Sequence, residues 1–138
     1  MQITDTQSAT RDKVDAFFTY FGAGDIPGLL ELFADEVDFT VNGAANVPWA
    51  GHRSDKGEIA EFFGLFGTHL TAPEEFALHT TLVDGEHAVV TGHCVFGVLS
   101  TGKKFTNAFA LHFTVADGKI VRYHMYEDSH AISAAFAA

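Results

Sequence analysis

The residues most able to do chemistry lie in the last strand that the sequence predicts. After the Asp117-Gly118 turn, segment 119–128 carries polar and aromatic side chains at both odd and even positions and ends in two adjacent carboxylates, Glu127 and Asp128. A strand with a purely structural role alternates apolar and polar residues instead. One face of this strand is therefore predicted to look into a cavity, where burial would raise the pKa of a carboxyl group and suit it to general acid or base catalysis.

The strand before this one sets which side chains face inward. Its odd-numbered residues, from Phe105 to Val115, are apolar except for Asn107. A three-residue hairpin loop at 117–119 would turn the matching face of the last strand inward, because residues paired across a hairpin share a face. The expected pairs are Val115 with Val121, Phe113 with Tyr123 and Leu111 with Met125, and Glu127 then also points inward.

Three of these inward residues are candidates for catalysis. Glu127 would move a proton, while Tyr123 and Asn107 would orient polar atoms of a substrate. Structural alternatives stay open, since Glu127 could be a solvated strand-end carboxylate or an ion-pair partner of Arg53 or a lysine, and Asn107 could bond to neighbouring backbone. Asp128 points the other way and is predicted to cap a helix in the C-terminal tail.

Apolar and aromatic residues form the predicted wall of the cavity. The fourteen phenylalanines either fill a core or line a pocket for an apolar ligand, and composition does not choose between the two. Trp49 either covers the cavity and stacks on a flat ligand or plugs the core. The residues predicted to bind the ligand are Phe17, Phe39, Val41, Trp49, Phe62, Phe109, Leu111 and Met125.

Three helices are predicted to precede most of the strands and to hold one side of this cavity. Apolar residues recur at helical spacing over 7–23. Asp25 caps a second, shorter helix that Asp35 and Glu36 close. Asp55 has capping-box spacing to a glutamate at the start of a third helix with a phenylalanine-rich apolar side.

The strands are predicted from two-residue periodicity. Apolar and polar residues alternate over 37–41, and a loop at 43–53 follows. From 74 to 128 the same period continues, and turn signals divide this segment into four antiparallel strands joined as hairpins. The order predicts an α+β fold, with three N-terminal helices on a curved, mainly antiparallel sheet in a single domain over 1–138. The turn signals are at 84–85, 101–102 and 117–118.

Composition excludes several classes of function. A formal charge of −10 argues against nucleic acid as a partner, because phosphate binding needs a basic face. The single cysteine, Cys94, suits a reducing compartment and is too little for a cysteine-based metal site. No apolar run is long enough to cross a membrane, and no signal core is present. We therefore expect a soluble cytoplasmic protein with no metal and no cofactor.

The order of these elements resembles one known family. Helix, helix, short strand, the motif Val47-Pro48-Trp49-Ala50-Gly51, helix and a four-strand meander with a Gly118-Lys119-Ile120 turn and a closing Tyr126-Glu127-Asp128 are similar to the SnoaL-like proteins. These belong to the nuclear transport factor 2-like, or ketosteroid isomerase-like, superfamily. Over about 11–136, the resemblance implies a cone-shaped α+β fold with a mostly apolar pocket and, commonly, a dimer through the outer sheet face. It does not imply one reaction.

The catalytic residues of ketosteroid isomerases have no counterparts here. Counted from the similar turn at 24–26, their oxyanion tyrosine corresponds to Phe17. Their base corresponds to Val41, or to Asn42 if the register differs by one, and their neutral aspartic acid falls near Leu111. Proton abstraction beside a ketone needs a base and an oxyanion donor, so the resemblance does not carry this mechanism over.

Of two other mechanisms in the superfamily, the sequence disfavours the first and leaves the second open. Limonene epoxide hydrolases resemble the chain at 118–123, but their last-strand aspartate corresponds to Met125. Polyketide cyclases of the SnoaL type need a pocket acid, which Glu127 could supply. We expect a cofactor-independent isomerase, cyclase or hydrolase-type enzyme acting on a small apolar cyclic substrate by acid–base chemistry. The alternative is a non-catalytic binder or carrier of an apolar small molecule.

Histidines gather on the predicted outer face of the sheet. A two-residue hairpin at 101–102 would pair Ala110 with His93 and bring His93, His112 and His124 into one patch. Imidazoles bind zinc, but without an adjacent carboxylate the patch is predicted to be a homodimer surface instead. Dimer affinity should then change between pH 8 and pH 5.5, as sedimentation would show.

Overall fold

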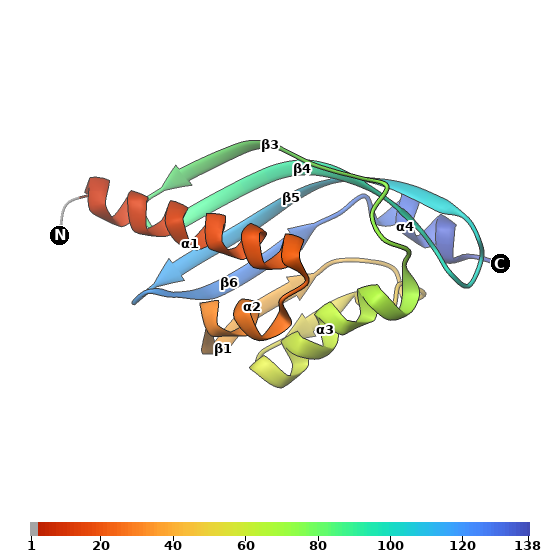
Figure 1. The fold of residues 1–138 in the computed structure, drawn as a ribbon, viewed down its shortest axis with the longest axis horizontal. Helices are drawn as coiled ribbons and strands as arrows, with labels where there is room; N and C mark the ends of the chain where they lie inside the picture. Colours follow the sequence, from red (N-terminus) through yellow and green to blue (C-terminus); the bar gives the residue numbers. More distant parts are fainter. Residues whose placement is uncertain (1–2) are drawn as a thin grey trace.

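Three helices cover one face of a curved, six-stranded sheet (Figure 1). The computed structural model describes residues 3–138. A fourth helix lies at the end of the sheet, near the C-terminus, where it contacts β5 (Figure 1). The helices are α1 (Ile3–Ala23), α2 (Ile26–Leu32), α3 (Lys56–His69) and α4 (Ser129–Phe136).

The sheet is antiparallel except for one pair of strands. Its order is β2-β1-β6-β5-β4-β3, and only β1 and β6 run parallel. The predicted four-strand meander is therefore β3 to β6, and the α+β fold class is confirmed. The strands are β1 (Phe33–Val41), β2 (Gly51–Arg53), β3 (Glu75–Asp84), β4 (His87–Gly97), β5 (Lys104–Ala116) and β6 (Lys119–Tyr126).

The predicted helix caps are confirmed. The carboxylate of Asp25 accepts from the Gly28 amide at 3.0 Å, and that of Asp55 accepts from the Glu58 amide at 2.8 Å. At the end of the chain, Asp128 accepts from the Ala131 amide at 3.1 Å and so begins α4. Each bond satisfies one of the amides that the first turn of a helix leaves without a partner.

The predicted end of the second helix and the predicted loop after the first strand are both wrong in part. The second helix ends at Leu32 rather than at Asp35, because Phe33 already pairs with Ile120 of β6 and is fully buried in the sheet. The predicted loop at 43–53 also contains β2, whose Arg53 pairs with Phe39. Both strand segments are specified by pairing with distant residues, which local periodicity does not detect.

The β5–β6 hairpin differs from its predicted register at one point. The turn has two residues, Asp117 and Gly118, both with positive φ (51° and 75°), as a tight hairpin turn of this sequence requires. Val115 therefore pairs with Ile120, and one extra residue, Val121, is accommodated in a bulge. The prediction that Val121 points into the core is wrong, since fully buried Ile120 takes that place. Beyond the bulge the predicted pairs Phe113–Tyr123 and Leu111–Met125 are confirmed.

An aromatic core joins α1 and α3 to the sheet. The Tyr123 ring stacks on Phe39 with centroids 4.2 Å apart and an interplanar angle of 4°. Phe17 of α1 meets both Tyr123 and Phe113 within 6 Å, and Phe62 of α3 meets Phe39 edge-on at 4.9 Å. Such offset and edge-to-face contacts add to the stabilisation from burial itself. This core fixes the inner wall on which the cavity is built.

Candidate functional site

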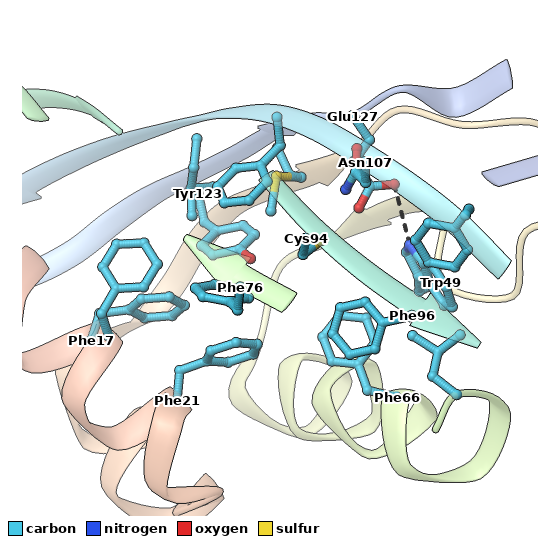
Figure 2. Close-up of a pocket in the computed structure, with 16 residues that line it drawn as sticks. Phe17, Phe21, Trp49, Phe66, Phe76, Cys94, Phe96, Asn107, Tyr123 and Glu127 are labelled. Atoms are coloured by element: carbon cyan, nitrogen blue, oxygen red, sulfur yellow. Dashed lines mark hydrogen bonds between the residues drawn. The ribbon is translucent and has the colours of Figure 1, made fainter. Parts of the chain in front are cut away.

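An aromatic cavity of about 50 Å³ lies between the sheet and the helices (Figure 2). Its walls come from α1, α3, the loop before β2 and the inner faces of β3 to β6. All its lining residues except Cys94, Asn107, Tyr123 and Glu127 are apolar. The sixteen lining residues are Phe17, Phe18, Phe21, Trp49, Phe66, Leu70, Phe76, Cys94, Phe96, Phe105, Asn107, Phe109, Leu111, Tyr123, Met125 and Glu127.

A wider cleft adjoins this cavity. It lies between the C-terminal end of α1, the helices α2 and α3, and the start of β3, and its volume is about 890 Å³. The cavity and the cleft share six lining residues, so a ligand in the cleft would lie directly beside the cavity. A volume of this size is typical of sites for drug-sized molecules. The shared residues are Phe18, Phe21, Phe66, Leu70, Phe76 and Phe96.

The polar end of the cavity holds Glu127. The indole Nε1 of Trp49 donates a hydrogen bond to Glu127 Oε2 at 3.3 Å (Figure 2). Burial raises the pKa of the Glu127 carboxyl to about 7, and the bond from Trp49 acts in the opposite direction. None of the cavity's sixteen lining residues is a lysine, arginine or histidine. The carboxyl group therefore titrates near neutral pH because it is desolvated and lacks a cationic partner.

Trp49 is held in place on several sides. Its side chain is only 1% exposed, and its ring meets Phe66 and Phe136 edge-on at 5.3 and 5.5 Å. Arg53 Nη1 donates to the carbonyl of Trp49 at 2.8 Å. Trp49 thus packs as a core residue and also lines the cavity. Stacking of its ring on a ligand stays a prediction.

Asn107 has a structural bond of the kind that the sequence left open. Its side chain is 3% exposed, and its Oδ1 accepts a hydrogen bond from the Asp128 amide at 2.8 Å. The side chain also lines the cavity beside Cys94, which is its pair on β4. Burial raises the pKa of the Cys94 thiol to about 12, so this thiol is neutral at physiological pH. Through its bond to the Asp128 amide, Asn107 joins the sheet to the start of α4.

Tyr123 directs its hydroxyl group toward the cavity (Figure 2). Burial raises its pKa, with a smaller contribution from the nearby charge of Glu127, so the phenol stays protonated. Over residues 3–138, no protein group hydrogen-bonds to this hydroxyl. Tyr123 can therefore donate a hydrogen bond to a polar atom inside the cavity.

Helix α4 packs through Phe136 on Trp49, the residue that bonds Glu127. Ser133 Oγ donates to Asn46 Oδ1 at 2.8 Å, and Asn46 Nδ2 donates to the Ser133 carbonyl at 3.0 Å. Thr101 Oγ1 donates to the Ala135 carbonyl at 2.6 Å. The helix is thus tied both to the loop that carries Trp49 and to the β4–β5 connection.

The residues predicted to bind a ligand lie in two places. Five of them line the cavity, namely Phe17, Trp49, Phe109, Leu111 and Met125. The other three, Phe39, Val41 and Phe62, do not line it and lie in the core, each at most 1% exposed. The lining residues Phe21, Phe66 and Phe105 were recognised only as parts of apolar faces. Contact of any of these side chains with a ligand stays a prediction.

The outer face of the sheet carries two histidine clusters instead of the predicted single patch. His93 pairs with Ala108, not Ala110, because the β4–β5 connection is longer than a two-residue turn and Gly97 pairs with Lys104. His93 Nδ1 lies 2.7 Å from His79 Nε2, and its other nitrogen contacts Glu75.

The second cluster lies further along the sheet and joins β4, β5 and β6. His112 Nε2 lies 3.1 Å from His87 Nδ1, and the rings of His112 and His124 are 6.4 Å apart. In the part of the chain that the structure describes, no three His, Cys, Asp or Glu side chains are arranged to hold a metal ion. Dimer formation through this face stays a prediction. No helix among residues 3–138 is both long and apolar enough to span a bilayer.

Comparisons with known proteins agree on the fold. A family model described as "SnoaL-like domain" matches residues 14–123. No curated protein sequence matches the chain significantly.

Solved structures match nearly the whole chain at low identity. An NTF2-like protein from Burkholderia xenovorans LB400 is 23% identical, covering 95% of this chain and 98% of its own, with a TM-score of 0.85. An NTF2-like protein of unknown function from Burkholderia pseudomallei K96243 is 21% identical over 94% and 98%, also at 0.85. TerC, co-crystallised with polyporic acid, is 22% identical over 94% and 99%, at 0.79. At these identities the likeness establishes the fold alone.

Proposed function

We propose that this chain, which belongs to the SnoaL-like domain family, is an acid–base enzyme that acts on a small apolar cyclic molecule without a cofactor. The observation that carries the proposal is the environment of Glu127. Its carboxyl group has a pKa raised to about 7 by burial and lies at the polar end of a cavity with aromatic walls. A carboxyl group that titrates near neutrality can both accept and return a proton during one turnover.

Two neighbouring groups complement Glu127 in this proposal. The Tyr123 hydroxyl would donate to an oxygen atom on which negative charge develops. Asn107 would orient a polar atom of the substrate through its amide nitrogen, because its Oδ1 is already held by the Asp128 amide. The cleft of about 890 Å³ beside the cavity offers space for the apolar rings of a substrate.

The proposed role of Glu127 is testable with a probe substrate. In 5-nitrobenzisoxazole, removal of the ring C–H proton by a base cleaves the N–O bond and releases a coloured cyanophenolate. We expect catalysis that rises from pH 6 to pH 8 with a midpoint near 7, as Glu127 ionises. Glu127→Gln should lower kcat/KM by about a hundredfold or more.

A matched control separates this effect from a general loss of charge. Glu36→Gln removes one exposed carboxylate and should leave the rate and its pH profile unchanged. If Glu127→Gln and the wild type turn over the probe equally, Glu127 is not the base.

One observation favours a non-catalytic binder as the second candidate. Among the described residues, Glu127 bonds to Trp49, whose indole does not titrate, and to neither Tyr123 nor Asn107, so the cavity holds no hydrogen-bonded acid–base pair. TerC, of the same fold, has been crystallised with polyporic acid, which is consistent with small-molecule binding in either case. Native mass spectrometry of the purified protein distinguishes the two. A retained small molecule without turnover of the probe supports a binder, and turnover that depends on Glu127 supports the enzyme.

A further inference from the structure

The charge at the polar end of the cavity has no counter-charge in the cavity wall. Glu127 Oε2 accepts from Trp49, while the other carboxylate oxygen has no hydrogen-bond partner within residues 3–138. The remaining polar groups that line the cavity are the Asn107 amide, the Cys94 thiol and the Tyr123 hydroxyl, and all three are neutral. A ligand anion would meet an ionised carboxylate and no cation. A ligand cation would meet the only charge that the cavity contains.

The aromatic walls of the cavity also favour a ligand cation over an anion. Ten of the sixteen lining residues are aromatic: Trp49, Tyr123 and eight phenylalanines. The faces of aromatic rings carry partial negative charge and attract ammonium groups, most strongly where water is excluded. The formal charge of −10 on the whole chain also raises the local concentration of cations.

We infer that the ligand of this cavity is an apolar ring compound that carries a protonated amine, and that its ammonium group binds the free carboxylate oxygen of Glu127. This inference rests on the proposed small-molecule site and narrows the ligand class of that site. The cavity of about 50 Å³ has room for an ammonium group and its methylene, and the adjoining cleft of about 890 Å³ takes the rings. The two volumes thus match a ligand with a small charged end and a large apolar body.

Three probes with the same ring system test the inference by calorimetric titration at pH 8. They are 2-naphthylmethylamine, 2-naphthalenemethanol and 2-naphthoate, which carry a cation, a neutral hydroxyl and an anion. We expect the amine to bind about tenfold more tightly than the alcohol, and the carboxylate not to bind detectably. Glu127→Gln should remove the advantage of the amine and leave the affinity for the alcohol unchanged, whereas Glu36→Gln should alter neither.

A pH series on the wild-type protein keeps the test valid if the variant fails to fold. The ionisable groups that interact with Glu127 are Cys94 and Tyr123, and both stay neutral between pH 8 and pH 5.5 because burial raises their pKa values. The amine stays protonated over this range. Its advantage over the alcohol should therefore shrink toward pH 5.5 as Glu127 takes up a proton.

The outcomes separate this inference from the proposed function. An alcohol that binds as tightly as the amine, or an amine advantage that is constant from pH 8 to pH 5.5, overturns the amine inference while leaving the site in place. Failure of all three probes to bind, together with no turnover of 5-nitrobenzisoxazole, overturns both.

Discussion

Two carboxylates on neighbouring strands of the sheet, Glu127 just after β6 and Asp38 on β1, have opposite electrostatic environments. On the outer face, Asp38 Oδ1 lies 2.9 Å from His124 Nε2, and Arg122 and His52 are within 4 Å. The contact with His124 lowers the pKa of Asp38 most, with partial burial acting against it. Glu127, on the inner side, has a single neutral donor, and its pKa is raised to about 7.

The face of the sheet, rather than the residue type, therefore decides which acid can exchange protons at neutral pH. The cations and histidines of this region, Arg122, His52, His112 and His124, lie on or beside the outer face. The inner face lacks them, so the carboxyl group there stays without a cationic partner.

The largest effect is expected from truncating a side chain on the inner face. Phe113 is fully buried against Phe17 and Tyr123, so Phe113→Ala should lower the free energy of unfolding by about 3–5 kcal/mol. Its neighbour Thr114 points outward, and Thr114→Ala should cost less than about 1 kcal/mol. Urea titration followed by circular dichroism measures both. Equal losses would mean that the two faces do not differ in packing.

An intermediate effect of the opposite sign is expected from Glu127→Gln. Because the pKa of Glu127 is raised on folding from 4.5 to about 7, the folded protein holds a proton that the unfolded chain loses between these values, and stability falls as pH rises through that window. Above pH 7 the variant should be more stable than the wild type by roughly 1–3 kcal/mol. The difference should vanish below pH 4.5, where the Glu127 carboxyl is protonated in both the folded and the unfolded chain. Thermal unfolding at pH 4.5, 6 and 8 checks this trend.

The smallest effect is expected from Asp38→Asn. The pKa of Asp38 is lowered on folding, so its contribution is present above 3.8 and is lost as pH falls through the folded-state value. The Asp38 side chain is 45% exposed and is screened by solvent, so the variant should lose no more than about 1 kcal/mol at pH 7. Denaturant titrations at pH 7 and pH 3 compare the two forms. A gain in stability at pH 7 would mean that the charge of Asp38 is not stabilised by His124 and Arg122 on the outer face.

Local sequence patterns predicted the inner face of the sheet correctly where strands alternate regularly. The apolar odd positions of β5 and the short turn after it placed Tyr123 and Met125 opposite Phe113 and Leu111. The predicted loop was one residue longer than the turn in the structure. The bulge at Val121 adds one residue to β6, so the strand pairs beyond the bulge are the predicted ones. A bulge leaves little trace in periodicity, because it changes pairing by only one residue.

Contacts between segments far apart in the chain could not be predicted from local sequence patterns. The bond from Trp49 to Glu127 joins residues 78 positions apart, through a loop whose path depends on β2 and α4. The position of His93 likewise depended on the length of the β4–β5 connection. The histidine clusters and the polar end of the cavity are therefore known only from the structure.

The position of α4 couples the acidity of Glu127 to the docking of a single short helix. Asn107 holds the Asp128 amide, Asp128 caps α4, and Phe136 of this helix packs on Trp49, which bonds Glu127. The ring of contacts closes only through residues of the C-terminal helix. Local unfolding of α4 would break this ring and hydrate Glu127, so its carboxyl group would return toward the acidity of an ordinary glutamate. The pKa of Glu127 therefore reports whether this one short helix is docked on the sheet.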